Sequence, residues 1–195
     1  MKPVPVTPKA CMILEEFERS RLTYQHNHDD FKRLMAKEPQ LHSIAKEFPE
    51  ATLEHFVLFL HDQPSGGVSI GYFKNQNRSE TRNLFARIDL VVVPEEFRGL
   101  GIAKVLVTGA LLQIIRAFPQ SLYSISCLAG HKAIEHILRH GGFTIDPRPE
   151  HHFSHCSLAL ENPQEMDAKF TDLLHKSIQQ ANYRIRQSPL FTPGP

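Results

Sequence analysis

The pattern of apolar and polar positions predicts helices and then strands in the first half of the chain. Residues 29–35 and 41–48 carry apolar side chains at helical spacing, and Pro39 separates the two predicted helices. Residues 53–61 are rich in Phe, Leu and Val, and residues 68–72 alternate between apolar and small or polar positions. These two runs predict an antiparallel pair of strands joined by a turn at residues 63–67.

The second half of the chain begins with a longer apolar run that predicts a strand buried on both faces, and Pro94 ends this strand. A long apolar helix, a strand, a second helix, a loop and a final strand follow it. Hairpins followed by parallel β-α-β crossovers predict a mixed α/β sheet. The expected ranges, beginning with the buried strand, are 84–93, 102–118, 122–128, 133–138, 146–149 and 152–160.

A last helix is predicted at residues 163–186, with an apolar stripe that runs from Met166 to Ala181. The stripe indicates packing against the chain's own sheet or helices, and a contact within a homodimer is the alternative. At 195 residues the chain fits one domain, which we place at residues 1–195 with its core at 29–160. Residues 188–195 contain three prolines and predict a flexible tail.

A glycine turn stands between the buried strand and the long helix. It reads Arg98-Gly99-Leu100-Gly101 and opens the helix at Ile102. Two glycines at the start of a helix leave backbone N–H groups uncovered at the positive end of the helix dipole, which favours a bound phosphate or pyrophosphate. The guanidinium of Arg98 adds a permanent positive charge beside the turn.

Two of the known phosphate-binding motifs do not fit this turn. A dinucleotide fingerprint needs a third glycine where Lys104 stands, and a P-loop needs a Gly-Lys-Ser/Thr run that the chain lacks. The pattern Arg/Gln-x-x-Gly-x-Gly/Ala is filled by Arg98, Gly101 and Ala103, and a Gly142-Phe143 pair follows one strand and one helix later. In these motifs the sequence resembles the GCN5-related N-acetyltransferase (GNAT) family.

The resemblance implies the acyl-coenzyme A N-acyltransferase fold, in which a mixed, mostly antiparallel sheet with splayed central strands is flanked by helices. It implies acetyl-CoA as co-substrate, with its pantetheine arm on one backbone edge and its pyrophosphate on the turn. His131 stands where many members carry the Asn that contacts the pantetheine arm. The implied backbone donors are Leu90, Val91, Val92 and Val93 for the pantetheine and Arg98, Gly99, Leu100, Gly101, Ile102, Ala103 and Lys104 for the pyrophosphate.

Asp89 is the candidate catalytic base, because an acid in an apolar strand must face a cleft or be paired. Many members of the family place a Glu on this strand. The rival interpretation is a structural ion pair with Arg87, which shares a strand face with Asp89 at period two. The reaction implied by the resemblance is transfer of an acetyl group to a primary amine by direct attack in a ternary complex.

The general acid is not fixed by the sequence. Many members of the family carry a Tyr where this chain has Leu138, and Tyr123, Cys127, His131 and His136 are the alternatives expected near the splayed strands. The departures at His131 and Leu138 leave a second function open, a non-catalytic acyl-CoA-binding or regulatory module. The acceptor is a small-molecule or peptide amine that the sequence does not identify.

Composition narrows the possible partners. With 22 basic and 21 acidic residues the net charge is +1, so we expect no nucleic-acid partner. Polar residues interrupt the long apolar helix, so we expect no membrane span. Three widely spaced cysteines do not form a disulfide framework, which predicts a reduced, cytoplasmic protein.

Histidines are frequent, with 12 in the chain, and raise the question of a metal site. His136 and His140 share a helix face, residues 151–156 hold three histidines and a cysteine, and residues 26–29 form a third group. None of these groups shows the two paired ligand sets of a closed zinc site. We therefore predict solvated histidines and no metal.

Overall fold

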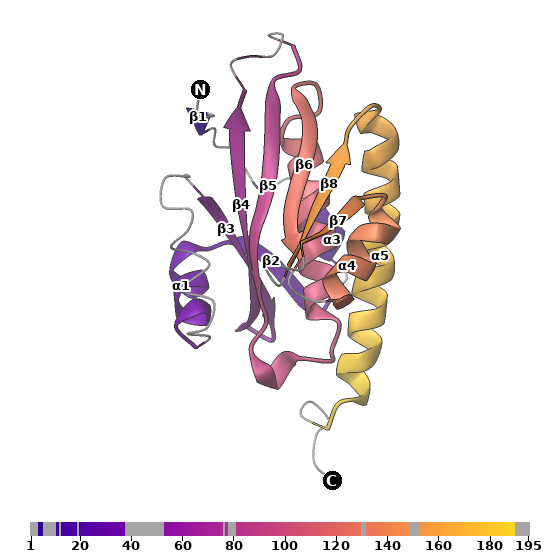
Figure 1. Cartoon of the computed structure of the whole chain (residues 1–195). Coiled ribbons are helices and arrows are strands. Elements are labelled where there is room, and N and C mark those ends of the chain that lie inside the picture. Colours follow the sequence, from indigo (N-terminus) through magenta and orange to yellow (C-terminus); the bar gives the residue numbers. More distant parts are fainter. Residues whose placement is uncertain are drawn as a thin grey trace.

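The computed structural model describes residues 4–5, 11, 13–18, 20–37, 53–75, 77, 81–129, 132–148 and 153–189. These residues build one open sheet with helices on both faces (Figure 1). The strand order is β2-β3-β4-β5-β6-β8-β7, with the short β1 (Val4–Pro5) pairing separately with β4. The strands are β2 (Leu22–His26), β3 (Leu53–Leu60), β4 (Gln63–Lys74), β5 (Leu84–Val92), β6 (Leu122–Ala129), β7 (Thr144–Arg148) and β8 (Phe153–Ala159).

Pairing within the sheet is mostly antiparallel. Within the described part of the chain the β5–β6 pair is the one parallel pair, and helix α3 (Ile102–Ala117) connects its two strands. A parallel pair needs such a crossover, because the chain must return to the same end of the sheet. The predicted class, a mixed and mostly antiparallel sheet flanked by helices, is confirmed.

Two glycines of β4 show how closely the helices approach the sheet. A Cβ added to Gly66 would lie 2.8 Å from Leu106 of α3, and one added to Gly67 would lie 2.6 Å from Phe31 of α1 (His28–Ala36). Successive residues of a strand point to opposite faces, so α1 and α3 cover opposite sides of the sheet. On each side a larger residue would force the neighbouring side chain to move.

The expected turn at residues 63–67 is therefore wrong. The chain reverses two residues earlier, at His61 and Asp62, whose φ angles of 50° and 63° are left-handed. Residues 63–67 already belong to β4 and pair with β3. Glycine occurs there because two helices press on the strand, whereas a sequence rule reads clustered glycines as a turn.

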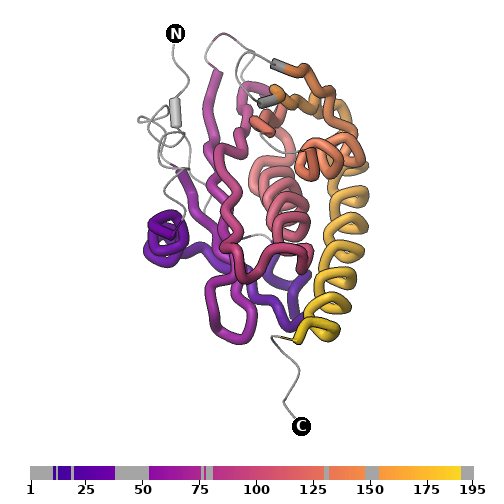
Figure 2. The backbone as a smooth tube through the Cα atoms, turned by 60° about the horizontal axis from the view of Figure 1, so that its bottom comes forward, coloured from indigo at the N-terminus to yellow at the C-terminus, as the bar shows by residue number. Residues whose placement is uncertain are grey.

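The long C-terminal helix α5 (Pro163–Gln187) runs alongside α3 (Figures 1 and 2). The side chain of Asn162 accepts a hydrogen bond from the Glu165 N–H at 3.4 Å, and Pro163 occupies the first turn, so both residues favour the start of the helix at this point. As predicted, the apolar stripe packs on the chain's own helices, which gives the alternative of a dimer contact no support. The buried residues of α5 are Phe170, Leu174, Ser177, Ile178, Ala181 and Ile185.

The helix α3 is apolar on all sides because the sheet covers one side and α5 the other. Buried residues also come from segments outside residues 29–160, including Phe17 in the short 3-10 helix η1 (Leu14–Phe17) and Tyr24 in β2. None of the described helices is long and apolar enough to cross a membrane.

The C-terminal strands differ from the prediction in one place. The expected loop at residues 146–149 is wrong for Asp146 to Arg148, because these residues belong to β7. Pro147 pairs in register with Ser154 of β8, and β7 is the edge strand, where a missing N–H costs little. The predicted helix at 41–48, residues 190–195 of the predicted tail and His131 lie outside the described residues.

Candidate active site

The central strands separate at Asp89. The parallel pairing of β5 with β6 ends at Ile88 and Cys127. On the other side of β5, Ile88 pairs with Ile70 and Leu90 with Ser69, so Asp89 is the extra residue of a β-bulge. Beyond this point β5 keeps β4 as its neighbour and loses β6.

The backbone at the open edge includes the residues predicted to hold the pantetheine arm. Leu90, Val91 and Val92 continue β5 past the last β6 partner, and Val93 follows the strand end and lines a cavity. Main-chain N–H and C=O groups on such an edge need a partner, which another chain, water or a ligand can supply. The donor role of these four residues stays a prediction.

The turn after β5 has the geometry that anion binding requires. The 3-10 helix η3 (Glu95–Phe97) leads into it, and Gly99 and Gly101 have φ angles of 80° and 88°. These left-handed angles explain the glycines, because an L side chain is strained there. The N–H groups of Lys104 and Val105 donate to the Gly101 carbonyl at 3.1 and 3.2 Å and start α3.

The N–H groups of residues 99–103 remain uncommitted. No acceptor for them occurs among the described residues, and Gly101, as N-cap of α3, offers no side-chain cap. A helix start without caps presents several N–H groups in one direction together with the positive end of the dipole. A Cβ at Gly99 would meet no atom within 4 Å, so this part of the turn faces open space.

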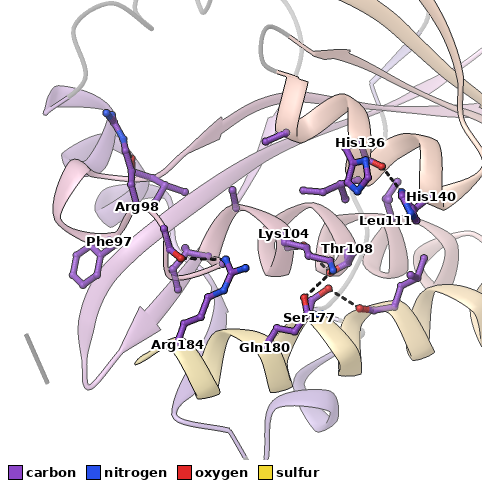
Figure 3. Close-up of a pocket in the computed structure, with 18 of the residues that line it drawn as sticks. Phe97, Arg98, Lys104, Thr108, Leu111, His136, His140, Ser177, Gln180 and Arg184 are labelled. Atoms are coloured by element: carbon purple, nitrogen blue, oxygen red, sulfur yellow. Dashed lines mark hydrogen bonds between the residues drawn. The ribbon is translucent and has the colours of Figure 1, made fainter. Parts of the chain in front are cut away.

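A cavity of about 580 Å³ lies beside the turn, between α3, α4 (Lys132–Gly141) and α5 (Figure 3). This volume is within the range of small-molecule sites, roughly 300–1,000 Å³. The predicted Leu100 is buried and does not line it. The lining residues are Val93, Phe97, Arg98, Gly99, Gly101, Ile102, Ala103, Lys104, Thr108, Leu111, Ala133, His136, Ile137, His140, Phe170, Leu173, Ser177, Gln180 and Arg184.

The cavity wall is basic. Arg98, Lys104 and Arg184 carry permanent positive charges, and none of its described lining residues is an acid. Arg98 is also held by the turn, since its Nε donates to the Val93 carbonyl at 3.2 Å. A small concave site with several cations and uncommitted N–H groups suits a ligand with phosphate groups.

Sequence reasoning missed the contribution of α5 to this wall. Ser177, Gln180 and Arg184 lie about 80 residues after the turn, and their helix was expected only to pack on the body of the protein. A single sequence carries no signal for which face of which helix a long terminal helix will cover.

Asp89 forms the ion pair that the sequence suggested, and it also keeps one oxygen unused. Arg87 Nε donates to Asp89 Oδ1, and the Arg87 guanidinium lies 5.1 Å from the centre of the Phe73 ring. The Asp89 side chain is 7% exposed, and its Oδ2 has no partner in the described part of the chain. Burial raises the pKa of the Asp89 carboxyl, and the charge of Arg87 opposes this shift only in part.

A second polar group lies next to the bulge. Ser69 of β4 pairs with Leu90, and its hydroxyl is buried with no partner among the described residues. Two unpartnered oxygens on neighbouring strands, Ser69 Oγ and Asp89 Oδ2, therefore flank the point where the sheet opens. Buried polar atoms of this kind call for a water or a ligand.

The candidate general acids that the structure describes are not assembled around this point, and His131 lies outside the described residues. Tyr123 is four residues before Cys127, roughly 13 Å along the strand, and its hydroxyl lies 3.3 Å from the Asn75 amide at the far end of the sheet. Its expected place near the splayed strands is wrong. Burial raises the pKa of the Cys127 thiol, which keeps it neutral. His136 lines the cavity, and Leu138 is fully buried in the core.

Four of the described histidines form two pairs, His28 with His55 and His136 with His140. The Nδ1 atoms of His28 and His55 are 2.8 Å apart, and burial lowers the pKa of His55 to about 4. His140 Nδ1 donates to the His136 carbonyl at 2.8 Å. No group of three candidate metal ligands occurs within the described ranges, and the absence of a metal stays a prediction.

Comparisons with known proteins place the fold. No family model matches the sequence, and no curated protein sequence matches it. Among solved structures, the chain is similar to a mutant AtaT toxin bound to the C-terminus of the antitoxin AtaR and acetyl-CoA, with a TM-score of 0.53 and 15% identity over 77% of this chain and 99% of that one. It is similar to FeeM, an N-acyl amino acid synthase from uncultured soil microbes, with a TM-score of 0.54 and 13% identity over 75% and 95%.

A third solved structure extends the likeness to a plant protein. NAA60 of Arabidopsis thaliana in complex with acetyl-CoA gives a TM-score of 0.50 and 14% identity over 71% of this chain and 98% of that one. Similarities at identities this low show the fold alone, so the activity has to be argued from the site. The described chain has the fold of the GNAT acyl-coenzyme A N-acyltransferases.

Proposed function

We propose that this protein is an acetyl-CoA-dependent N-acetyltransferase that acts on a primary amine by direct attack in a ternary complex. The observation that carries the proposal is the placement of an uncapped glycine turn at the end of a strand that has separated from its parallel neighbour. The same fold holds acetyl-CoA in the AtaT and NAA60 structures, and FeeM is by its description an N-acyl amino acid synthase.

The turn and the open strand edge have distinct parts in the proposed complex. The uncommitted N–H groups of residues 99–103, with Arg98, hold the pyrophosphate of acetyl-CoA, and the edge of β5 from Leu90 to Val93 holds the pantetheine arm. The Lys104 N–H, which was expected to take part, already donates to the Gly101 carbonyl. Fixing both ends of the arm places the thioester at the bulge. Main-chain N–H groups there stabilise the negative charge that develops on the carbonyl oxygen during attack.

Asp89 accepts the proton of the attacking amine, directly or through water. The amine nitrogen bonds to the thioester carbon, the carbon–sulfur bond breaks, and coenzyme A leaves as the thiolate. Arg87 holds Oδ1 and fixes the carboxyl, while Oδ2 has no partner among the described residues and is available for the proton. A raised pKa brings the carboxyl closer to the range in which a base works near neutral pH.

Binding of the cofactor is the first test. Calorimetric titration with acetyl-CoA and with free coenzyme A should give micromolar affinities. Gly101→Asp should abolish binding because it places a negative charge on the turn, and Gly101→Ala is the matched control that carries the same left-handed strain without charge. Retained affinity in Gly101→Asp would contradict the assignment of the turn.

A non-catalytic acyl-CoA-binding module is the second candidate. Two observations favour it: the core position of Leu138, where many family members carry the acid, and the ion pair that engages Asp89. Release of thiol in the presence of a panel of amines separates the candidates. In an enzyme, Asp89→Asn loses turnover at least about a hundredfold and keeps coenzyme A affinity, as expected for loss of a general base. A binding module shows no turnover to lose.

A further inference from the structure

The second half of α5 reaches the glycine turn itself. Arg184 Nη1 donates to the Gly99 carbonyl at 3.1 Å, and Lys104 Nζ donates to Gln180 Oε1 at 2.9 Å (Figure 3). A Cβ built on Gly101 would lie 3.6 Å from both the Cα and the Cβ of Ala181, so the α5 backbone passes beside the turn. The helix therefore completes the cavity on the side away from the sheet.

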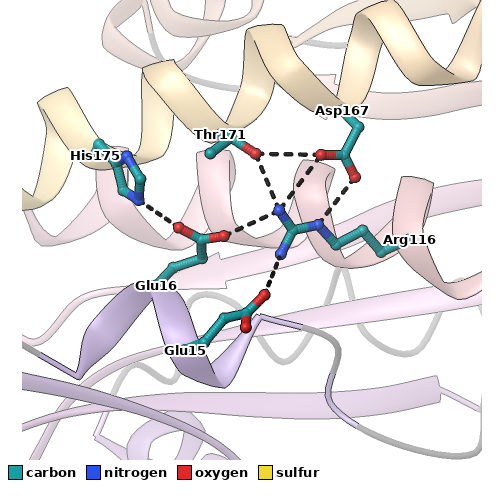
Figure 4. Close-up of polar contacts among 6 residues, drawn as sticks. All are labelled: Glu15, Glu16, Arg116, Asp167, Thr171 and His175. Atoms are coloured by element: carbon teal, nitrogen blue, oxygen red, sulfur yellow. Dashed lines mark hydrogen bonds and ion pairs between the residues drawn. The ribbon is translucent and has the colours of Figure 1, made fainter.

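The first half of α5 is seated by a separate set of contacts. Arg116 of α3 binds Asp167 at 2.9 Å and Thr171 at 3.1 Å, and it also binds Glu16 of η1 at 2.9 Å (Figure 4). His175 of α5 contacts the same Glu16. Together with the buried stripe, this network holds the helix, so its position does not depend on Arg184.

Two cations of the cavity wall, Lys104 of α3 and Arg184 of α5, have only neutral partners among the described residues. Lys104 bonds to an amide oxygen and Arg184 to a main-chain carbonyl, and neither forms an ion pair with any described residue. Both belong to the cavity wall, which has no described acid. Two uncompensated charges from different helices, directed at one cavity, favour an anion between them.

We propose that Lys104 and Arg184 form a second anion site, which binds the 3′-phosphate of coenzyme A. This inference rests on the proposed function. Coenzyme A carries a pyrophosphate and a separate phosphate on its adenosine ribose. With the pyrophosphate on the turn, the adenosine end enters the cavity, whose apolar side chains between α3, α4 and α5 suit the adenine ring. These apolar side chains are Leu111, Ala133, Ile137, Phe170 and Leu173.

The test compares coenzyme A with 3′-dephospho-coenzyme A by calorimetry on the full chain. The wild-type protein should bind coenzyme A more tightly than 3′-dephospho-coenzyme A, because only coenzyme A carries the phosphate for the second site. Arg184→Gln should weaken coenzyme A about tenfold and dephospho-coenzyme A less than about twofold, because only the former has the phosphate that the guanidinium contacts. Arg184→Lys keeps the charge and should restore part of the preference. Affinity for the dephospho ligand reports in every variant that the fold is intact.

Arg186→Gln is the matched control, since Arg186 is an exposed residue of the same helix that does not line the cavity. It removes the same charge and should leave both affinities unchanged. Equal affinity of the wild-type protein for the two ligands would overturn the second site and leave coenzyme A binding in place. If Arg184→Gln weakened the affinity for both ligands equally, the second site would also be overturned. Arg184 would then affect binding only through its hydrogen bond to the turn. If neither ligand binds the wild-type protein, both the second site and the proposed function are wrong.

Discussion

Asp89 forms the predicted ion pair, and its geometry is also compatible with the proposed role as a base. The pair with Arg87 uses one carboxylate oxygen, and burial leaves the other without a described partner. An unsatisfied buried acceptor costs about 1–3 kcal/mol, so Oδ2 calls for a partner such as a water or a ligand. In the proposed mechanism the pair positions the carboxyl, and Oδ2 takes the proton of the amine.

Replacing Arg87 should move the pH dependence of catalysis. The guanidinium lowers the pKa of Asp89 against the effect of burial, so Arg87→Met should raise that pKa further. The base is active when deprotonated, and the acidic limb of the kcat/KM profile should therefore move to higher pH by about one unit. Arg87→Lys keeps a positive charge and should move it less. An unchanged acidic limb in Arg87→Met would show that Asp89 is not the group that titrates.

Glu54 supplies a second prediction at the residue scale. Its side chain is buried beside Tyr24 and Tyr72, and burial raises its pKa from 4.5 to about 7. The folded state then holds the proton more tightly than the unfolded state. The stability contributed by this proton is complete below about pH 4.5 and is lost as the pH rises through about 7.

Glu54→Gln should remove the loss of stability that accompanies deprotonation of Glu54 at higher pH. Relative to the wild-type protein, the free energy of unfolding in urea should rise by up to about 3 kcal/mol at pH 8 and change little at pH 4.5. The exposed Glu18→Gln is the control and should shift stability by less than about 0.5 kcal/mol at either pH. A pH-independent effect of Glu54→Gln would mean that the carboxyl is charged in the folded protein.

At the scale of elements, the docking of α5 joins the cavity to the rest of the fold. Arg116, which is 18% exposed, links α3, α5 and η1. Arg116→Met should destabilise this junction by about 1–3 kcal/mol, because it leaves Glu16 and Asp167 without their cation. Hydrogen exchange should then speed up in residues 163–187.

The pair of Lys176 and Asp172 on the same helix offers a control for that experiment. Its atoms are 2.7 Å apart, yet both side chains are about 60% exposed, at 62% and 60%. Exposed pairs of this kind contribute little, so Lys176→Met should leave the exchange of α5 within about twofold of wild type. Equal effects of the two substitutions would show that the Arg116 network has no special part in docking.

Helices and strands with strong local patterns were predictable from the sequence. The helices that pack on them and the register of neighbouring strands were not. The strand at 84–93, the helix after the turn and the last helix follow from apolar periodicity and from Pro and Gly at their ends. Gly66 and Gly67 misled the prediction because their cause is the approach of α1 and α3, which come from distant parts of the sequence. Tyr123 was misplaced for a related reason, since the register of β6 against β5 is set by the whole sheet.

The candidate site likewise has parts that the sequence predicts and parts that only the structure shows. Turn residues such as Gly99 and Gly101 are recognisable because their backbone angles demand glycine. The bulge at Asp89 arises from the offset between two strands, and the wall formed by Arg184 arises from the packing of α5 on α3. Neither has a local sequence signature, so both required the structure.

For the whole molecule, ligand binding and stability should be linked. A ligand that binds only the folded state adds about 2.7 kcal/mol at a concentration one hundred times its Kd. For a chain of this size that corresponds to a rise in Tm of roughly 5–10 °C. Acetyl-CoA should produce this rise in the wild-type protein, measured by scanning calorimetry, and should not do so in Gly101→Asp.

The distribution of that stabilisation over the molecule follows from the cavity walls. In the proposed complex acetyl-CoA contacts the turn, α3, α4 and the second half of α5, which line the cavity, so hydrogen exchange should slow in residues 98–104 and also in residues 177–184. The helix α1 covers the opposite face of the sheet, and its exchange should stay the same. Protection confined to the turn and β5 would show that the ligand does not reach α5. Protection in both segments, reduced in the second by Arg184→Gln, would show that the C-terminal helix is part of the binding site.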